Sequence, residues 1–176
     1  LNSAQTGACR LLEDLGFQYE VLSYEQIQRG GLKDFRVLVL PSSFALTDGE
    51  VRAIRQFVQG GGMLVADLVP GVLDGHCRPL EHGSLDDLFG VTQSGLPKKP
   101  ATAETIKPLV HKAGPGWAAL LNGEFGPYEG QRKSGEGGPL RDAMRGFLRQ
   151  AGVQPAVAIE VAGKPLEGCE IVRFLD

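Results

Sequence analysis

Apolar and polar residues follow two rhythms along this chain of 176 residues. Apolar side chains recur every three or four positions in segments 4–15, 51–58 and 140–151, which is typical of helices with one buried face. Between them, 36–40 and 63–66 are almost continuously apolar, as in strands that are covered on both faces of a parallel sheet. Helices that alternate with such strands predict an α/β fold, with a mainly parallel sheet between two layers of helices.

The ends of these helices carry recognisable signals. Asn2 is a suitable cap for the first helix, and Thr47 and Glu50 have the spacing of a capping box at the start of the second. Gly60–Gly62 end that second helix and lead into the next strand. Residues 36–66 therefore predict a β-α-β unit with a right-handed crossover.

Other elements have weaker patterns. Residues 122–138 contain six glycines and predict a mobile loop, and Pro139 is a suitable first residue for the last helix. The remaining expected elements are a strand at 17–23, a short helix at 84–90, a hairpin formed by 109–111 and 117–121, and β-like runs at 156–161 and 169–175.

Composition and charge exclude two classes of partner. The formal net charge is −3, so no basic face is broad enough to neutralise several phosphates, and we expect no nucleic-acid partner. No apolar run approaches the roughly 20 residues that span a bilayer, so we expect no membrane partner either.

The sequence does not decide the cellular compartment of the protein, although it slightly favours the cytoplasm. The three cysteines are widely spaced without a CxxC motif, which favours reduced thiols over disulfides or a zinc site.

Three stretches of the sequence are similar to a known family. They are LVLPSSFALTDGEVRAIRQFVQGGGMLVADLVPGVLDGHCRPLEHGSLDDLFGV, GPGWAALLNGEFGPY and LRDAMRGFLRQAGVQPAV. Together they resemble the class I glutamine amidotransferase-like domain known as the trimerisation domain of bacterial β-galactosidases. The resemblance implies a flavodoxin-like three-layer sandwich that lies between a catalytic (β/α)8 barrel and a small C-terminal β domain. The role that it implies is subunit assembly.

From this resemblance we expect an amidotransferase-like α/β domain at 1–152 and a β hairpin at 153–176 that leads toward a C-terminal β domain. The expected partners are other domains of the parent chain and further copies of it in a homo-oligomer. Family members begin with a strand ahead of the first helix, whereas this sequence opens on the helix. Either that strand lies upstream of Leu1 or the sheet lacks an edge. The barrel is absent, so galactosidase activity is assigned to no residue here.

The turn after strand 63–66 decides whether the domain has amidotransferase chemistry. Class I amidotransferases need a cysteine there, because the turn presents the thiolate beside backbone donors for the oxyanion. The corresponding turn, Asp67–Gly71, contains neither cysteine nor serine. We therefore expect a non-catalytic domain without catalytic residues or a cofactor.

Two alternative functions remain open. One is a stand-alone cysteine amidase or hydrolase, for which Cys77 would be the nucleophile. The other is a carbohydrate-binding module, in which Trp117, Phe125 and Tyr128 would stack on a sugar ring if their side chains were exposed. Core packing is the competing interpretation of these aromatic residues.

Asp67 itself has two interpretations. Its carboxylate accepts backbone N–H groups of the turn or of a following helix start, which we prefer, or it lines a polar crevice with Ser42 and Ser43 at the end of the neighbouring strand. Such a crevice would contact a sugar or a loop of a partner.

Several other polar residues have ligand-like or acid-base side chains. Asp74, His76, Cys77 and His82 fall in one nine-residue window, but their spacing is unlike that of common zinc sites, and we expect no metal. The remaining candidates are His111, expected to be a partly buried strand residue, and the pairs Asp86–Asp87 and Glu13–Asp14, expected to be solvated on helices.

Overall fold

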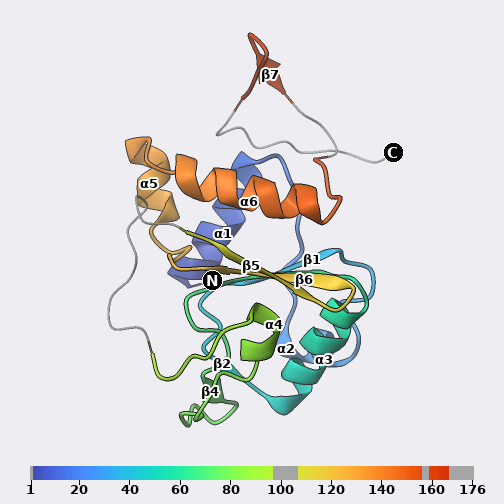
Figure 1. Ribbon diagram of the computed structural model, residues 1–176. Coiled ribbons are helices and arrows are strands. Elements are labelled where there is room, and N and C mark those ends of the chain that lie inside the picture. Colours follow the sequence, from blue (N-terminus) through green and yellow to red (C-terminus); the bar gives the residue numbers. More distant parts are fainter. Residues whose placement is uncertain (1, 97–106, 156–158, 167–176) are drawn as a thin grey trace.

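A four-stranded sheet forms the centre of the computed structural model, which describes residues 2–96, 107–155 and 159–166 (Figure 1). The strand order is β1-β3-β6-β5, where β1, β3 and β6 are mutually parallel and β5 runs antiparallel to β6. This confirms the mainly parallel sheet and the predicted β5–β6 hairpin. The strands are β1 (Val37–Leu40), β3 (Met63–Asp67), β5 (Leu109–Ala113) and β6 (Gly116–Leu121).

Helices cover both faces of this sheet (Figure 1). On one face lie α1 (Ser3–Asp14), α5 (Tyr128–Ser134) and α6 (Gly138–Gln150). On the other face lie α2 (Tyr24–Gln28), α3 (Asp48–Gln59) and α4 (Asp86–Phe89). The arrangement is the three-layer α/β architecture that the alternation of helices and buried strands predicts.

The burial of strand β3 on both faces explains why its sequence is almost continuously apolar. All five of its residues are buried. Met63 and Val65 belong to the core beneath α1, α5 and α6, whereas Leu64 and Ala66 belong to the core above α2, α3 and α4. Successive side chains of a strand point to opposite faces, so a strand covered on both sides needs apolar residues at every position.

The helix starts follow from local hydrogen bonds. Asn2 accepts the N–H of Gln5 at the start of α1, and Thr47 forms a reciprocal capping box with Glu50 at the start of α3, as predicted. Ser23 forms a third such box and so initiates α2. The strands on either side of α3 pair in parallel, which confirms the β-α-β unit.

The predicted strand at 17–23 is wrong. Among the described residues, this segment pairs with no strand, and the N–H of Phe17 donates to the carbonyl of Leu12 at the end of α1. Residues 18–21 are exposed. The apolar pattern of the segment is suited to a strand, but a strand forms only where a neighbouring backbone pairs with it.

The glycine-rich stretch 122–138 contains a helix, contrary to the predicted loop. Helix α5 begins after Pro127 and ends at Gly135, whose φ of 81° lies in the left-handed region that glycine adopts easily. Tyr128 anchors the helix in the core, and Lys133 forms an ion pair with Glu129. One buried aromatic residue and two helix-end signals therefore outweigh the glycines.

Two small sheets lie outside the central one. Strands β2 (Ala45–Leu46) and β4 (Leu73–Asp74) pair in parallel, which the sequence pattern did not predict because each has only two residues. Strands β7 (Glu160–Val161) and β8 (Lys164–Pro165) form a short antiparallel hairpin. The predicted run at 169–175, and part of the run at 156–161, lie outside the described residues.

Candidate functional site at the carboxyl ends of the strands

Asp67 is the last residue of β3, at the edge of the sheet where β1 and β6 also end. Its side chain is fully buried. Oδ1 accepts the N–H of Ser42 at 2.5 Å, and Oδ2 accepts the N–H of Phe125 at 3.1 Å. One carboxylate therefore holds together the connections that follow three adjacent strands. It accepts backbone N–H groups, as the preferred interpretation states, but the donors belong to neighbouring connections and not to its own turn.

The position of Phe125 depends on a close approach of α1. Gly7 lies against the backbone of Phe125, and a Cβ atom at residue 7 would stand 1.9 Å from the Phe125 carbonyl oxygen. Only glycine permits this distance. The contact fixes the segment that supplies one of the two N–H groups to Asp67.

Burial raises the pKa of Asp67 to about 6. The N–H groups of Phe125 and Ser42 lower the pKa, and the nearby charge of Glu124 raises it, but desolvation is the largest cause. A carboxylate with a pKa near neutral pH is suited to general-base catalysis. However, no histidine is paired with it: His111 contacts the carbonyl of Leu88, and His76 and His82 lie on the exposed loop after β4.

The sharp turn after β3 carries an apolar side chain. Leu68 has a φ of 59°, in the left-handed region that residues other than glycine rarely adopt. Its N–H donates to the carbonyl of Leu121 at 2.9 Å, and its carbonyl accepts the Gln93 side-chain amide at 2.7 Å. Leucine has no side-chain group that attacks a carbonyl.

Ser42 and Ser43 follow β1 at the same edge. Ser42 also has a positive φ, of 46°, and its Oγ stands 3.5 Å from Oδ2 of Asp67. Both serines line a groove of about 1090 Å³, which Asp67 does not line. The structure thus brings the three residues of the expected crevice together. Ligand binding there stays a prediction.

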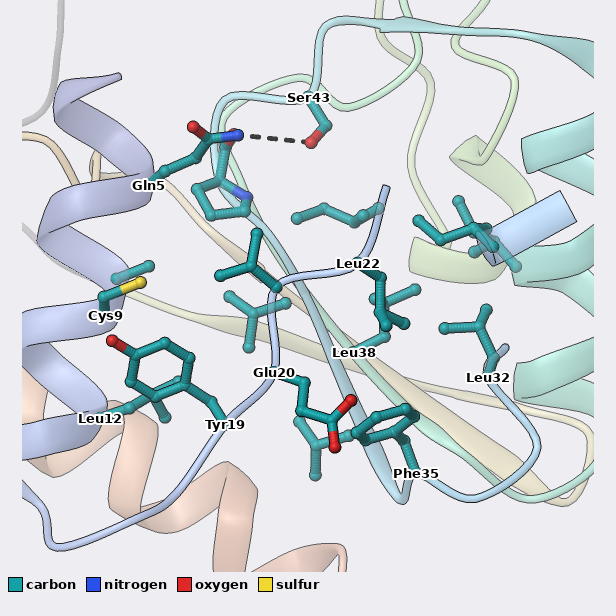
Figure 2. Close-up of a pocket in the computed structure, with 18 of the residues that line it drawn as sticks. Gln5, Cys9, Leu12, Tyr19, Glu20, Leu22, Leu32, Phe35, Leu38 and Ser43 are labelled. Carbon is teal, nitrogen blue, oxygen red and sulfur yellow. Dashed lines mark hydrogen bonds between the residues drawn. The ribbon is translucent and has the colours of Figure 1, made fainter. Parts of the chain in front are cut away.

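The groove extends from these serines along β1. Its walls are α1, the extended segment 17–22 and β1, and its lining is mostly apolar (Figure 2). Cys9 and Tyr19 face one another inside it, and Tyr19 donates its hydroxyl hydrogen to Glu13 at 2.8 Å. Hydrogen bonding with Cys9, followed by burial and Glu13, raises the pKa of Tyr19 above its ordinary value.

The loop with four ligand-like residues is held by its own aspartate. Asp74 Oδ1 accepts the N–H groups of His76 and Arg78, both at 2.9 Å, and Oδ2 pairs with the Arg78 guanidinium at 2.8 Å. Across the ranges that the structure describes, no three His, Cys, Asp or Glu side chains are grouped to hold a metal ion. Cys77 is exposed.

Two of the three aromatic candidates belong to the core. Phe125 and Tyr128 are fully buried, so neither presents a ring face to a sugar. Trp117 is partly buried, and the Lys112 ammonium lies 5.4 Å from its ring centroid. The carbohydrate-binding alternative therefore keeps only Trp117 from its aromatic set.

The expected solvation of the paired carboxylates is wrong for one member of each pair. Asp14 is buried and accepts the hydroxyl of Tyr128 at 2.7 Å and the guanidinium of Arg132 at 2.9 Å. Asp86 is buried and accepts the N–H groups of Gly83 and Gln93. The Tyr128 partner of Asp14 lies 114 residues away, so no local pattern marks Asp14, whereas the partners of Asp86 lie three and seven residues from it. His111 is partly buried on β5, as expected.

Comparisons with known proteins place this architecture. The sequence matches no known family profile and no curated protein. Two structures of Gan42B, a GH42 β-galactosidase from G. stearothermophilus, match 87% and 88% of this chain at 14% identity, with TM-scores of 0.60 and 0.61. The chain shares its fold with part of these enzymes. A β-galactosidase from Bacillus circulans sp. alkalophilus gives a TM-score of 0.59 over 88% of the chain, also at 14% identity.

The matched region is a minor part of each relative. This chain spans 26% of the Gan42B chains and 28% of the Bacillus circulans chain. The similarity is therefore one of fold within a longer protein. None of the described helices has the length and apolar character needed to cross a membrane.

Proposed function

We propose that this chain is a non-catalytic accessory module of a β-galactosidase-like glycoside hydrolase, with a flavodoxin-like amidotransferase fold, and that it supports subunit assembly. The observation that carries the proposal is the turn after β3. Leu68, at the turn where the resemblance implies a nucleophile, has no reactive group, and the adjacent carboxylate of Asp67 accepts two backbone N–H groups. The fold shared with part of GH42 β-galactosidases supports the choice of parent protein.

The surface supports a role in assembly. Strand β5 lies at the edge of the sheet that the structure describes, and its first two residues, Leu109 and Val110, are 46% and 39% exposed. Apolar side chains on an open strand edge favour association with another chain, because association buries both the side chains and the unpaired backbone. The partners that fit are the other domains of a longer parent chain and further copies of that chain.

Sedimentation of the chain over a wide range of concentrations tests this proposal. We expect reversible self-association that the double variant Leu109→Lys and Val110→Lys weakens at least tenfold. Leu96→Lys is the matched control, because Leu96 is also exposed but lies outside the sheet. A monomer at every concentration, alone and joined to a catalytic barrel, would contradict the assembly role.

Assays for the two alternative functions complete the test. Glutamine hydrolysis that Cys77→Ser abolishes would favour an amidase. Saturable quenching of Trp117 fluorescence by galactosides would favour a carbohydrate-binding module. We expect neither result, because Leu68 supplies no nucleophile and two of the three candidate rings are buried.

A further inference from the structure

Two backbone segments flank the sheet without a neighbouring strand among the described residues. On one flank, β5 pairs with β6 and with no other strand that the structure describes. On the other flank, the extended segment 18–22 lies across the groove from β1 and likewise has no strand partner in the described chain. Unpaired N–H and C=O groups along such a segment favour pairing with another chain.

Contacts of β5 show which face of the sheet each of its side chains occupies. We call the side covered by α2, α3 and α4 the α3 face, and the side covered by α1, α5 and α6 the α6 face. His111 contacts the carbonyl of Leu88 on α4 and so lies on the α3 face. The Lys112 ammonium lies over Trp117, which packs against the core of the α6 face. Side chains alternate along a strand, so odd-numbered residues of β5 occupy the α3 face and even-numbered ones the α6 face.

The segment 18–22 alternates between the same two faces. Leu22 packs against the core of the α3 face, and Glu20 lines a small cavity together with Leu22. Tyr19 points the other way, toward α1, and donates its hydroxyl hydrogen to Glu13 on that helix (Figure 2). Even-numbered residues of the segment therefore occupy the α3 face, and odd-numbered ones the α6 face.

The directions of the two segments decide how copies of the chain could join. Figure 2 shows the segment running from Glu20 to Leu22 in the direction in which β1 runs from Leu38 toward Ser43. Strand β5 runs the opposite way, because it is antiparallel to β6 and β6 is parallel to the other strands. A second copy that continues the sheet, with its helix layers on the same sides, therefore sets its segment 18–22 antiparallel to β5 of the first.

Full overlap of the two five-residue segments then gives one register. This register sets α3-face residues opposite α3-face residues, and α6-face residues opposite α6-face residues, as a continuous sheet requires. The five pairs are Gln18–Ala113, Tyr19–Lys112, Glu20–His111, Val21–Val110 and Leu22–Leu109. Apolar side chains meet apolar ones, a carboxylate meets an imidazole, and a tyrosine ring meets an ammonium group.

Neither segment complements itself as well. Two copies of 18–22, paired antiparallel at full overlap, set Glu20 against Glu20, and like charges directly opposite one another are destabilising. Two copies of β5 set Lys112 against Val110, so an ammonium group meets an apolar side chain at two positions. Each segment therefore fits the other better than it fits a second copy of itself.

We propose that β5 of one copy binds segment 18–22 of a second copy as an antiparallel strand, so that the sheet continues from copy to copy. This proposal rests on the assembly role proposed above and names the surface that β5 recognises. The contact covers Tyr19, Val21, Leu109 and Val110, which are all exposed in the single copy. It joins two different surfaces and is heterologous, so repetition closes a ring or extends a chain of copies.

Two variants each disable one side of the contact. The β5 variant carries Leu109→Lys and Val110→Lys, and the segment variant carries Glu20→Lys and Val21→Lys. All four positions are exposed, so we expect both variants to fold. In sedimentation, each variant alone should associate at least tenfold more weakly than the native chain.

The matched control for the segment variant lies on β7. Glu160 and Val161 repeat the dipeptide of Glu20 and Val21, and the two valines are 57% and 58% exposed. The double variant Glu160→Lys and Val161→Lys therefore makes the same change of charge and apolar surface away from the sheet. We expect its association to stay within twofold of the native chain.

An equimolar mixture of the two edge variants gives the decisive result. The β5 variant keeps an intact segment 18–22, and the segment variant keeps an intact β5, so one complete contact remains between them. We expect a 1:1 dimer with the native affinity to within threefold, and no larger species. Amide hydrogen exchange at 18–22 of the β5 variant should slow at least tenfold when the segment variant is added.

The other outcomes separate this contact from assembly in general. A segment variant that associates as tightly as the native chain, while the β5 variant does not, would overturn this proposal in favour of a contact between two β5 strands and would leave the assembly role in place. Two weakened variants that fail to combine would also overturn it. A native chain that stays monomeric would contradict the assembly role and this contact together.

Discussion

Two aspartates end strands in this fold, and both carboxylates accept backbone N–H groups, but one binds distant segments and the other binds its own turn. Asp67 ends β3, Asp74 ends β4, and each carboxylate accepts two backbone N–H groups. The donors to Asp67 lie 25 residues before it and 58 residues after it, whereas those to Asp74 lie two and four residues after it. The first carboxylate joins distant segments, and the second closes its own turn.

Burial separates the two aspartates electrostatically. Desolvation raises the pKa of Asp67 to about 6, although its hydrogen bonds act in the opposite direction. Near the surface, the N–H of Arg78 is the largest cause of a lowered pKa at Asp74, with help from His76 and the Arg78 side chain. The two pKa values therefore shift in opposite directions, because desolvation is the largest cause only at Asp67 and the Arg78 guanidinium acts only on Asp74.

The largest expected effect is on the free energy of unfolding. Asp67→Ala leaves the buried N–H of Phe125 and the part-buried N–H of Ser42 without an acceptor. The first costs about 1–3 kcal/mol and the second about 1 kcal/mol, so we expect a loss of about 2–4 kcal/mol. Denaturant unfolding at a pH below 6 measures it, because the desolvation cost of the ionised form is then small. Asp74→Ala is the control and should cost clearly less. Equal losses would remove the distinction between the two sites.

The second effect is a pH dependence with a defined sign. The folded pKa of Asp67 is about 6 against an ordinary value of 3.8, so its stabilising contribution is complete below 3.8 and is lost as the pH rises through 6. The stability of the native chain relative to Asp67→Asn should therefore fall over this range, by up to about 3 kcal/mol. Paired denaturant curves across the range measure this difference. A flat difference would mean that water reaches Asp67.

The third effect compares two residues with left-handed backbone. Leu68 follows Asp67 with a φ of 59°, and Cys77 follows Asp74 three residues later with a φ of 60°. Glycine relieves about 1 kcal/mol of strain at either site. Leu68→Gly also gives up about 2–3 kcal/mol of apolar burial, for a net loss of about 1–2 kcal/mol. Exposed Cys77→Gly should instead leave the thermal midpoint unchanged or raise it.

The smallest effect is the mirror image of the second. The folded pKa of Asp74 is lowered, so its contribution is present above the ordinary aspartate pKa and is lost as the pH falls through the folded value. Relative to Asp74→Asn, the native chain should lose stability only in acid, in the opposite direction to Asp67. Thermal melts in acidic buffers check this, and a trend parallel to that of Asp67 would contradict it.

Local signals account for the parts of the fold that could be predicted. Helix periodicity and the capping residues Asn2 and Thr47 located α1 and α3, because their partners lie within four residues along the chain. The apolar run of β3 indicated a strand buried on both faces because the run itself carries the signal, whichever helices cover it. The prediction of a strand at 17–23 was wrong because a strand needs a neighbouring backbone to pair with, and the described chain places none there.

The candidate site was harder to predict, because its contacts are long-range. The residue types were found, and Ser42, Ser43 and Asp67 do lie together, since parallel strands end at one edge of the sheet. Nothing in the sequence near Asp67 indicates that Phe125 donates to it. The same limit explains Asp14, whose partner Tyr128 lies 114 residues away.

The close approach of Gly7 to Phe125 has a mechanical consequence. Helix α1 forms one wall of the groove, and the peptide that it touches through Gly7 also supplies an N–H to Asp67. Because no side chain separates the two backbones, a displacement of α1 toward Phe125 moves the N–H group that Asp67 accepts. The pKa of Asp67 should therefore respond to the position of the helix.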